Sequence, residues 1–101
     1  MILGDLGADV LKIEQPESGD ETRGWGPPFD TSHASAYFLA VNRNKMSVAA
    51  DLDAPSDRAM LQRLMAEADV VVENFRPGAL ERRELGAEAM LARHPRLLWC
   101  T

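Results

Sequence analysis

The sequence has one cysteine and no long apolar run. Because Cys100 has no second cysteine to pair with, an intrachain disulfide is excluded, and a reducing cytoplasm is the expected location. No apolar stretch approaches the roughly 20 residues that a membrane-spanning helix needs, so we expect no membrane partner. Residues 1–14 lack a basic region and a cleavage site of the kind that signal peptides carry.

Basic residues are outnumbered: 11 Lys and Arg against 16 Asp and Glu give a net charge of −5. Nonspecific nucleic-acid binding needs a basic face, so we expect no nucleic-acid partner. Any anionic ligand would have to be met by locally placed Arg and Lys side chains. The two histidines, His33 and His94, have no cysteine or carboxylate at metal-ligand spacing, so no metal is expected.

Glycine-rich nucleotide loops are also missing. The sequence contains no GxGxxG segment, so a dinucleotide-dependent oxidoreductase is not supported. It contains no Walker-type Gly-Lys-Ser/Thr loop either.

What the sequence does contain is a regular alternation of β and α patterns within 101 residues, enough for one small domain. Apolar and β-branched runs predict strands at 8–14, 46–52 and 69–74. The last of these is a continuous buried run of the kind found in parallel sheets. Strands that alternate with helices imply parallel βαβ units with right-handed crossovers. The predicted fold class is α/β, a Rossmann-like parallel sheet with flanking helices.

Helices are predicted between these strands. One covers 32–41, capped by Thr31 or Ser32. A second follows Asp53 as its N-cap, with Pro55 in its first turn. Its apolar face consists of five residues: Met60, Leu61, Leu64, Met65 and Ala68. A charged helix starts at about 78, breaks near Gly86, resumes over 87–93 and ends before Pro95.

Both ends of the chain look interrupted. "MILGDLG" is typical of the last turn of a helix, with Gly7 as a left-handed cap. "RLLWCT" begins a new apolar run, in which Cys100 is expected to be a buried small hydrophobe. We therefore expect a fragment, incomplete at both ends.

Polar and aromatic residues gather where the predicted strands end. In open parallel sheets ligands bind beyond the carboxyl ends of the strands, so three corners are expected to line one crevice. These corners are Glu14-Gln15-Pro16, Asp51-Leu52-Asp53 and Asn74-Phe75-Arg76. At the third, the Asn amide can hydrogen-bond a base or ribose, the Phe ring can stack, and the Arg can pair with phosphate. A plain strand-to-helix turn with a surface arginine is the alternative.

Three segments resemble a known family in their order and spacing: "LGADVLKIEQPESGDETRGWGPPF", "AYFLAVNRNKMSVAADL" and "EADVVVENFRPGALERRELG". They resemble the class III CoA-transferase family (CaiB/BaiF type), which includes formyl-CoA transferases and α-methylacyl-CoA racemases. The resemblance covers nearly the whole chain. The "TRGWGPP" loop followed by "NRNK" is more similar to the transferase branch than to the racemase branch.

The resemblance implies a fold and an activity. Residues 1–101 would be part of the N-terminal, CoA-binding, Rossmann-like large domain of an interlocked homodimer. Coenzyme A would move between carboxylic acids through an aspartate that forms a mixed anhydride, so the partners are a CoA thioester and a carboxylic acid. The implied CoA-binding residues, together with those at the strand ends, are Gln15, Ala50, Asp51, Leu52, Asp53, Asn74, Phe75, Arg76 and Arg82.

The sequence departs from the family pattern at two of these positions. Asp53 stands where a lysine is common, and Gln15 stands where some members have a basic residue. Both departures remove positive charge from the neighbourhood of a polyanion. For Asp53 a helix cap is the favoured explanation.

No catalytic residue is expected within the chain. The family's nucleophilic aspartate lies beyond residue 101, and no carboxylate present occupies the matching motif. Covalent catalysis needs a carboxylate held against the thioester, with neighbours that stabilise the developing charge. The chain alone is therefore predicted to be inactive. The alternatives are an acyl-CoA racemase of the same family and a catalytically inactive truncated protein that acts by association.

Overall fold

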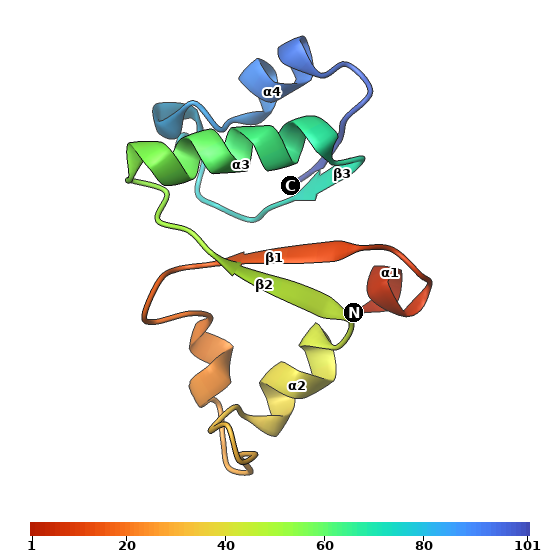
Figure 1. The fold of residues 1–101 in the computed structure, drawn as a ribbon, viewed down its shortest axis with the longest axis vertical. Coiled ribbons are helices and arrows are strands. Elements are labelled where there is room, and N and C mark those ends of the chain that lie inside the picture. The colour runs from red at the N-terminus through yellow and green to blue at the C-terminus, as the bar shows by residue number, and fades with distance from the viewer. The chain divides into compact units, whose positions relative to one another are not determined.

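The computed structural model describes residues 1–101 as two compact units, Met1–Ala50 and Asp51–Thr101. Each unit contains one pair of parallel strands accompanied by helices (Figure 1). The predicted α/β class is confirmed, in the form of short parallel strand pairs. None of the helices has the length and apolar character required to cross a membrane.

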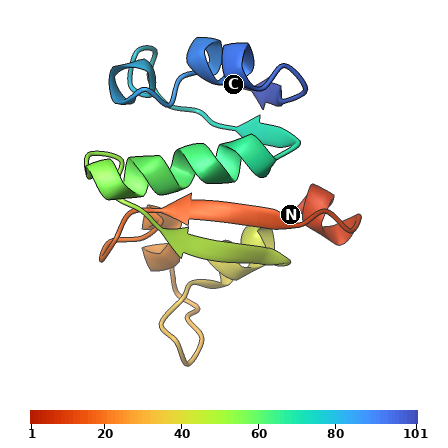
Figure 2. The same cartoon turned by 45° about the horizontal axis from the view of Figure 1, so that its top comes forward.

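The first unit contains, in order, α1 (Ile2–Asp5), β1 (Val10–Glu14), η1 (Glu21–Gly24), α2 (Ala36–Asn42) and β2 (Lys45–Ala49). The two strands run side by side in the same direction, with Val10 opposite Lys45 and Glu14 opposite Ala49 (Figure 2). Both strands were expected from the sequence, since β1 lies within the predicted strand 8–14 and β2 overlaps the predicted strand 46–52.

Helix α1 ends as its sequence predicts. Gly7 has a φ of +98°, which a residue with a Cβ rarely adopts. The amide of Ala8 donates to the carbonyl of Leu3 at 3.0 Å, and that of Gly7 to Gly4 at 3.1 Å. These two bonds satisfy the last carbonyls of the helix in the manner of a Schellman cap. The chain is thereby turned directly into β1.

The two faces of the first strand pair differ in character. Side chains alternate along a strand, so Lys12 and Glu14 share one face with Ser47, while Leu11 and Ile13 point to the other. Leu11 and Met46, which are opposite each other in the register, are 42% and 59% exposed. Parallel strands are usually covered by apolar groups on both faces. Here one face is polar, and the apolar face is largely exposed.

Helix α2 starts later than predicted, so the expected cap at Thr31 or Ser32 is wrong. The N-cap is Ser35, whose hydroxyl accepts from the amide of Phe38 at 3.1 Å and donates to a carbonyl of η1 at 2.6 Å. The carboxylate of Asp30 accepts from the amides of Ser32 and Ala34. It therefore folds residues 30–34 into a turn that competes with a helix start.

The second unit contains α3 (Pro55–Glu67), β3 (Val70–Val72), η2 (Glu81–Arg83), α4 (Ala87–Arg93) and β4 (Leu98–Cys100). β3 pairs with β4 in parallel, with Val70 opposite Leu98. Helices α3 and α4 contact each other. The buried side chains of this unit are Leu61, Leu80, Leu85, Met90 and Leu97.

Several boundaries in this unit follow the prediction. Pro55 occupies the first turn of α3. Gly86 is the N-cap of α4, which ends at Arg93 before Pro95. The segment after 78 is different, because it forms a 3₁₀ turn that ends at Glu84 with a φ of +58° instead of an α-helix.

Two further predictions about the second unit are wrong. The N-cap of α3 is Ala54, with no side-chain capping bond, so Asp53 is not the helix cap. Cys100 is exposed, not buried. Cys100 lies opposite Val72 in the strand register, so the two side chains share one face of the strand pair. Val72 is itself 67% exposed and does not shield the thiol from solvent.

Candidate functional site

The carboxyl end of β1 is built around a buried carboxylate. Glu14 is only 7% exposed, and its two oxygens accept four hydrogen bonds. Two come from the guanidinium of Arg23, both at 2.9 Å, one from the hydroxyl of Ser47 at 2.8 Å, and one from the amide of Asp20 at 2.9 Å. A buried charge is tolerated when it is paired and hydrogen-bonded in this way. The Arg23 hydrogen bonds chiefly lower the pKa of Glu14, from its ordinary 4.5 to about 2.

The loop after β1 is fixed by the same group of residues. Asp20 pairs with Lys12 at 2.7 Å and caps η1 by accepting from the amide of Thr22 at 2.9 Å. The Lys12 contact is the main reason why the pKa of Asp20 falls to about 2. The Arg23 guanidinium lies 4.0 Å from the centroid of the Phe38 ring, a cation–π contact that ties the loop to α2.

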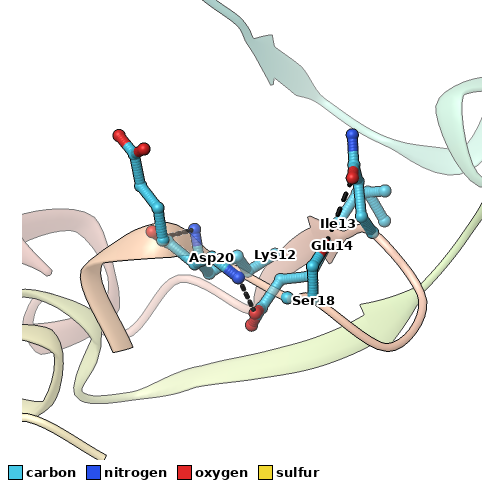
Figure 3. A pocket seen from close by; sticks show the side chains of 8 residues that line it. Lys12, Ile13, Glu14, Ser18 and Asp20 are labelled. Carbon is cyan, nitrogen blue, oxygen red and sulfur yellow. Dashed lines mark hydrogen bonds and ion pairs between the residues drawn. The ribbon is translucent and has the colours of Figure 1, made fainter. Parts of the chain in front are cut away.

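Gln15 is one of the residues that line an open hollow of about 400 Å³, together with Lys12, Glu14 and Asp20 (Figure 3). Its side-chain oxygen accepts from the hydroxyl of Ser18 at 3.2 Å, and its carbonyl accepts from the amide of Gly19 at 3.0 Å. The lining includes Lys12 and three carboxylates, those of Glu14, Asp20 and Glu21. Because the lysine is already paired, the hollow is a poor place for a phosphate group. Gln15 keeps only its exposed amide NH₂ for a ligand.

In the second unit the Asn-Phe-Arg segment follows β3 as irregular backbone. The side chains of Asn74 and Arg76 are exposed and make no hydrogen bond within the chain, and Phe75 is 50% exposed. The amide of Phe75 donates to the carboxylate of Glu73 at 2.8 Å. An amide, a ring and a guanidinium are thus presented to solvent together at the end of the strand.

Arg82 lies close to the turn that follows this segment. It is exposed on η2, and a Cβ on Gly78 would lie 3.9 Å from one of its terminal nitrogens. Gly78 itself has a φ of +83° and comes only two residues after Arg76. Arg82 thus lies against Gly78 of this turn, and its place beside Asn74 and Phe75 at a common site stays a prediction.

Asp53 contacts η2, the element that carries Arg82, and does not have the predicted role of a helix cap. Its carboxylate accepts from the Nε of Arg83 at 2.7 Å, and this bond is the first cause of a lowered pKa at Asp53. The carbonyl of Asp53 accepts from Arg58 at 3.2 Å, while Arg83 also donates to the carbonyl of Ala79 at 2.8 Å. Asp53 thus bridges the start of α3 to η2 instead of capping the helix.

The remaining predicted residues lie at the junction after β2. Ala50 is buried, and its amide donates to the carbonyl of Glu14 at 2.9 Å. The amide of Asp51 donates to the Asp57 carboxylate at 2.8 Å, and Leu52 is partly buried. The expected crevice shared by three strand ends involves residues of both units and stays a prediction.

Sequence reasoning missed three of the residues that organise these corners. Arg83 belongs to a charged segment of the sequence with no distinguishing pattern, and it lies 30 residues from its partner Asp53. Arg23 binds Glu14 at the end of β1, and Glu73 joins the end of β3 to Trp99 and Thr101, through contacts that no local pattern signals. The only trace of Arg23 in the sequence is that it is the one basic residue of the loop over 15–31. No group of three His, Cys, Asp or Glu side chains converges as a metal site would require.

Comparison with known proteins gives consistent matches. The profile of CoA-transferase family III matches residues 1–101. The succinate–glutarate CoA-transferase of Agrobacterium fabrum is 45% identical over 105 residues, covering 99% of this chain and 26% of that protein. The human succinyl-CoA:glutarate CoA-transferase is 46% identical over 101 residues, covering 100% of this chain and 23% of that protein.

A solved structure agrees with these matches. The crystal structure of a CAIB/BAIF family protein from Brucella suis has a TM-score of 0.90 and 50% sequence identity, covering 97% of this chain and 26% of that one. The chain thus spans about a quarter of the length of the relatives that it matches. Since the family profile covers every residue, the chain belongs to CoA-transferase family III.

Proposed function

We propose that this chain supplies part of the coenzyme A site of an enzyme that transfers CoA between carboxylic acids. The part in question is the corner formed by Asn74, Phe75, Arg76 and Arg82. The proposal extends to Gln15 and residues 50–53, at the ends of the first two strands, and to a Rossmann-like domain that includes both units. CoA thioesters and carboxylic acids would be the substrates of the whole enzyme, and a homodimer would be its assembly.

The observation that carries the proposal is the exposure of Asn74, Phe75, Arg76 and Arg82 together after one strand. An unpaired amide suits a base or ribose, a half-exposed ring suits a stacked adenine, and two arginines suit phosphate. Coenzyme A carries all three kinds of group. In a chain with a net charge of −5, two free arginines at one corner give an anion a local place to bind.

The chemistry of the whole enzyme is inferred from the family. An aspartate outside residues 1–101 would attack the acyl thioester, forming an acyl-aspartyl anhydride and releasing CoA thiolate. Attack of the thiolate on the aspartyl carbonyl would release the donor carboxylate and give an aspartyl-CoA thioester. The acceptor carboxylate would then displace the thiolate to form a second anhydride, and attack of the thiolate on the acceptor's carbonyl would give the acceptor's CoA thioester and free the aspartate. Succinate and glutarate, which the names of the reported relatives contain, are both dicarboxylates. We therefore propose dicarboxylic acids as the class of acyl group and acceptor.

Calorimetric titration of CoA into the purified chain tests the binding proposal. We expect saturable binding that Asn74→Ala and Arg82→Ala each weaken by roughly five- to twentyfold, because each substitution removes a hydrogen-bonding or charged contact. Arg63→Ala is the matched control, because Arg63 is exposed on α3 and its replacement removes the same charge. Absence of binding by the folded wild-type chain contradicts the proposal, as does equal weakening by all three variants.

A separate assay addresses catalysis. The chain lacks the proposed nucleophile, so we expect no CoA transfer from succinyl-CoA to glutarate when the product is followed by chromatography. Turnover by the purified chain would show that the catalytic carboxylate lies within residues 1–101.

A further inference from the structure

Glu73 connects the end of β3 to the end of β4. One oxygen of its carboxylate accepts from the amide of Phe75 at 2.8 Å. The other accepts from the hydroxyl of Thr101 at 2.6 Å and from the indole N–H of Trp99 at 3.4 Å. The amide of Glu73 donates to the carbonyl of Cys100 at 3.0 Å, which extends the β3–β4 ladder by one bond. A single side chain thus holds the turn after β3 against the neighbouring strand.

The hydrogen-bond partners of the Glu73 carboxylate argue against a direct role of this residue in binding CoA. A carboxylate would repel a phosphate, so a Glu73 that faced the ligand would oppose the arginines proposed to bind it. All three donors to Glu73 instead come from the chain itself, and two of them belong to β4 and the residue after it. These hydrogen bonds, led by the one from Thr101, also lower the pKa of Glu73. Glu73 therefore stays charged and occupied within the protein.

We propose that Glu73 is a positioning residue for the coenzyme A site, holding Asn74 and Phe75 in the conformation that meets the ligand. The inference depends on the proposed function, because it assigns Glu73 a task in that same site. Asn74 and Phe75 are exposed. The backbone bond from the Phe75 amide to Glu73 is the contact that restricts this stretch.

The expected loss of CoA affinity follows from the entropic cost of ordering the turn after β3 when the ligand binds. A turn that is free before binding must be ordered when the ligand binds, whereas a turn held in advance has already lost that freedom. Loss of the Glu73 carboxylate should thus weaken CoA binding roughly three- to tenfold, through the freedom of two side chains. Glu73→Gln should restore most of the affinity, because its oxygen can still accept from Phe75 while its NH₂ donates to Thr101.

The first arm of the experiment needs no ligand. Amide exchange of Phe75, measured by NMR on the full 101-residue chain, is expected to be faster in Glu73→Ala than in wild type, with Glu73→Gln in between. Thr101→Val is a milder variant that leaves the carboxylate in place and removes one donor to it. It should accelerate exchange by a smaller factor, so the prediction can be tested even where Glu73→Ala fails to fold.

The second arm measures CoA affinity by calorimetry in Glu73→Ala, Asn74→Ala and the double variant. A positioning role predicts that Glu73→Ala weakens binding in the wild-type background and weakens it by a smaller factor once Asn74 has been replaced. A merely structural role would weaken binding equally in both backgrounds, and this result would overturn the inference. So would a wild-type affinity in Glu73→Ala. If the wild-type chain does not bind CoA, the proposed function fails, and the inference fails with it. Binding by the wild type with no response to Glu73 refutes the inference alone.

Discussion

A Cβ atom on Gly19 would lie 3.0 Å from the Oε2 atom of Glu14. The same Cβ would lie 3.2 Å from the Nε of Arg23, and Gly19 has a φ of +63°. Glycine is favoured here by two independent conditions, since the backbone is left-handed and an ion pair occupies the space that a Cβ would approach. The loop after β1 thus packs closely over its buried carboxylate at a position that has no side chain.

Gly19→Ala is therefore expected to destabilise the first unit by about 1–2 kcal/mol. Gly24→Ala is the control, because Gly24 lacks a positive φ and a Cβ there would meet nothing within 4 Å. Urea unfolding followed by the fluorescence of Trp25, in a Trp99→Phe background, measures the difference between the two variants. Equal stability of both would show that the ion pair moves aside without cost.

Glu14 makes the stability of the first unit depend on pH. Its folded pKa of about 2 lies below its ordinary value of 4.5, so the charged form is stabilised by folding. That contribution is complete above pH 4.5 and is lost as the pH falls toward 2. Each pKa unit corresponds to about 1.4 kcal/mol, so we expect Glu14→Gln to cost roughly 2–3 kcal/mol at pH 7 after allowance for solvent screening.

The pH profile separates this effect from general acid denaturation. Urea midpoints between pH 7 and pH 2 should fall less steeply in Glu14→Gln than in wild type. Asp20, whose pKa is also about 2, accounts for a residual slope that Asp20→Asn should remove. Glu17→Gln, which replaces an exposed acid of the same loop, is the control. A wild-type slope in Glu14→Gln would contradict the assignment.

Ser35→Ala is expected to destabilise the first unit by about 1–2 kcal/mol. The hydroxyl of Ser35 is fully buried, caps α2 through the amide of Phe38 and donates to the carbonyl of Thr22. Ser35→Ala leaves the amide of Phe38 and the carbonyl of Thr22 without this hydrogen-bond partner. Thermal unfolding should show a clear loss of stability, whereas Ser32→Ala, at an exposed turn position, should change the melting temperature little. The opposite order of the two variants would restore Ser32 as the cap.

Asp53→Asn is expected to raise CoA affinity roughly two- to fivefold, the range of exposed charge interactions. The substitution removes a carboxylate that is paired with Arg83 and that also interacts with Arg82. Both arginines would then be available to a phosphate. Asp69→Asn removes the same charge at the amino end of β3 and serves as the control in calorimetric titrations. A weaker affinity in Asp53→Asn would mean that the bridge to η2 is itself needed for binding.

The sequence indicated those parts of the fold that depend on local chemistry. Gly7, Pro55 and Gly86 mark helix ends through their own backbone preferences, and all three lie where the pattern placed them. The helix caps were predicted wrongly at Thr31 or Ser32 and at Asp53. In the first case a local turn around the Asp30 carboxylate takes the place of the helix start, and in the second Asp53 is engaged by Arg83, 30 residues away.

At the candidate site, the sequence places Asn74 directly after a strand, and its side chain is exposed there. Its role in binding a ligand together with Arg82 stays a prediction. The contacts of Glu73 with Trp99 and Thr101 join residues 26 and 28 positions apart, which no periodicity reveals. Strand ends can be located from sequence, but the side chains that hold them in place become visible only in three dimensions.

The uncovered side of each strand pair has a practical consequence for the isolated chain. In the first unit that side includes Leu11, Ile13 and Met46, and in the second it includes Val70, Val72 and Leu98. Exposed apolar surface of this kind binds fluorescent hydrophobic dyes and promotes aggregation as the protein concentration rises. Sulfate and phosphate buffers strengthen the tendency, so purification in dilute chloride buffer will keep more of the chain in solution.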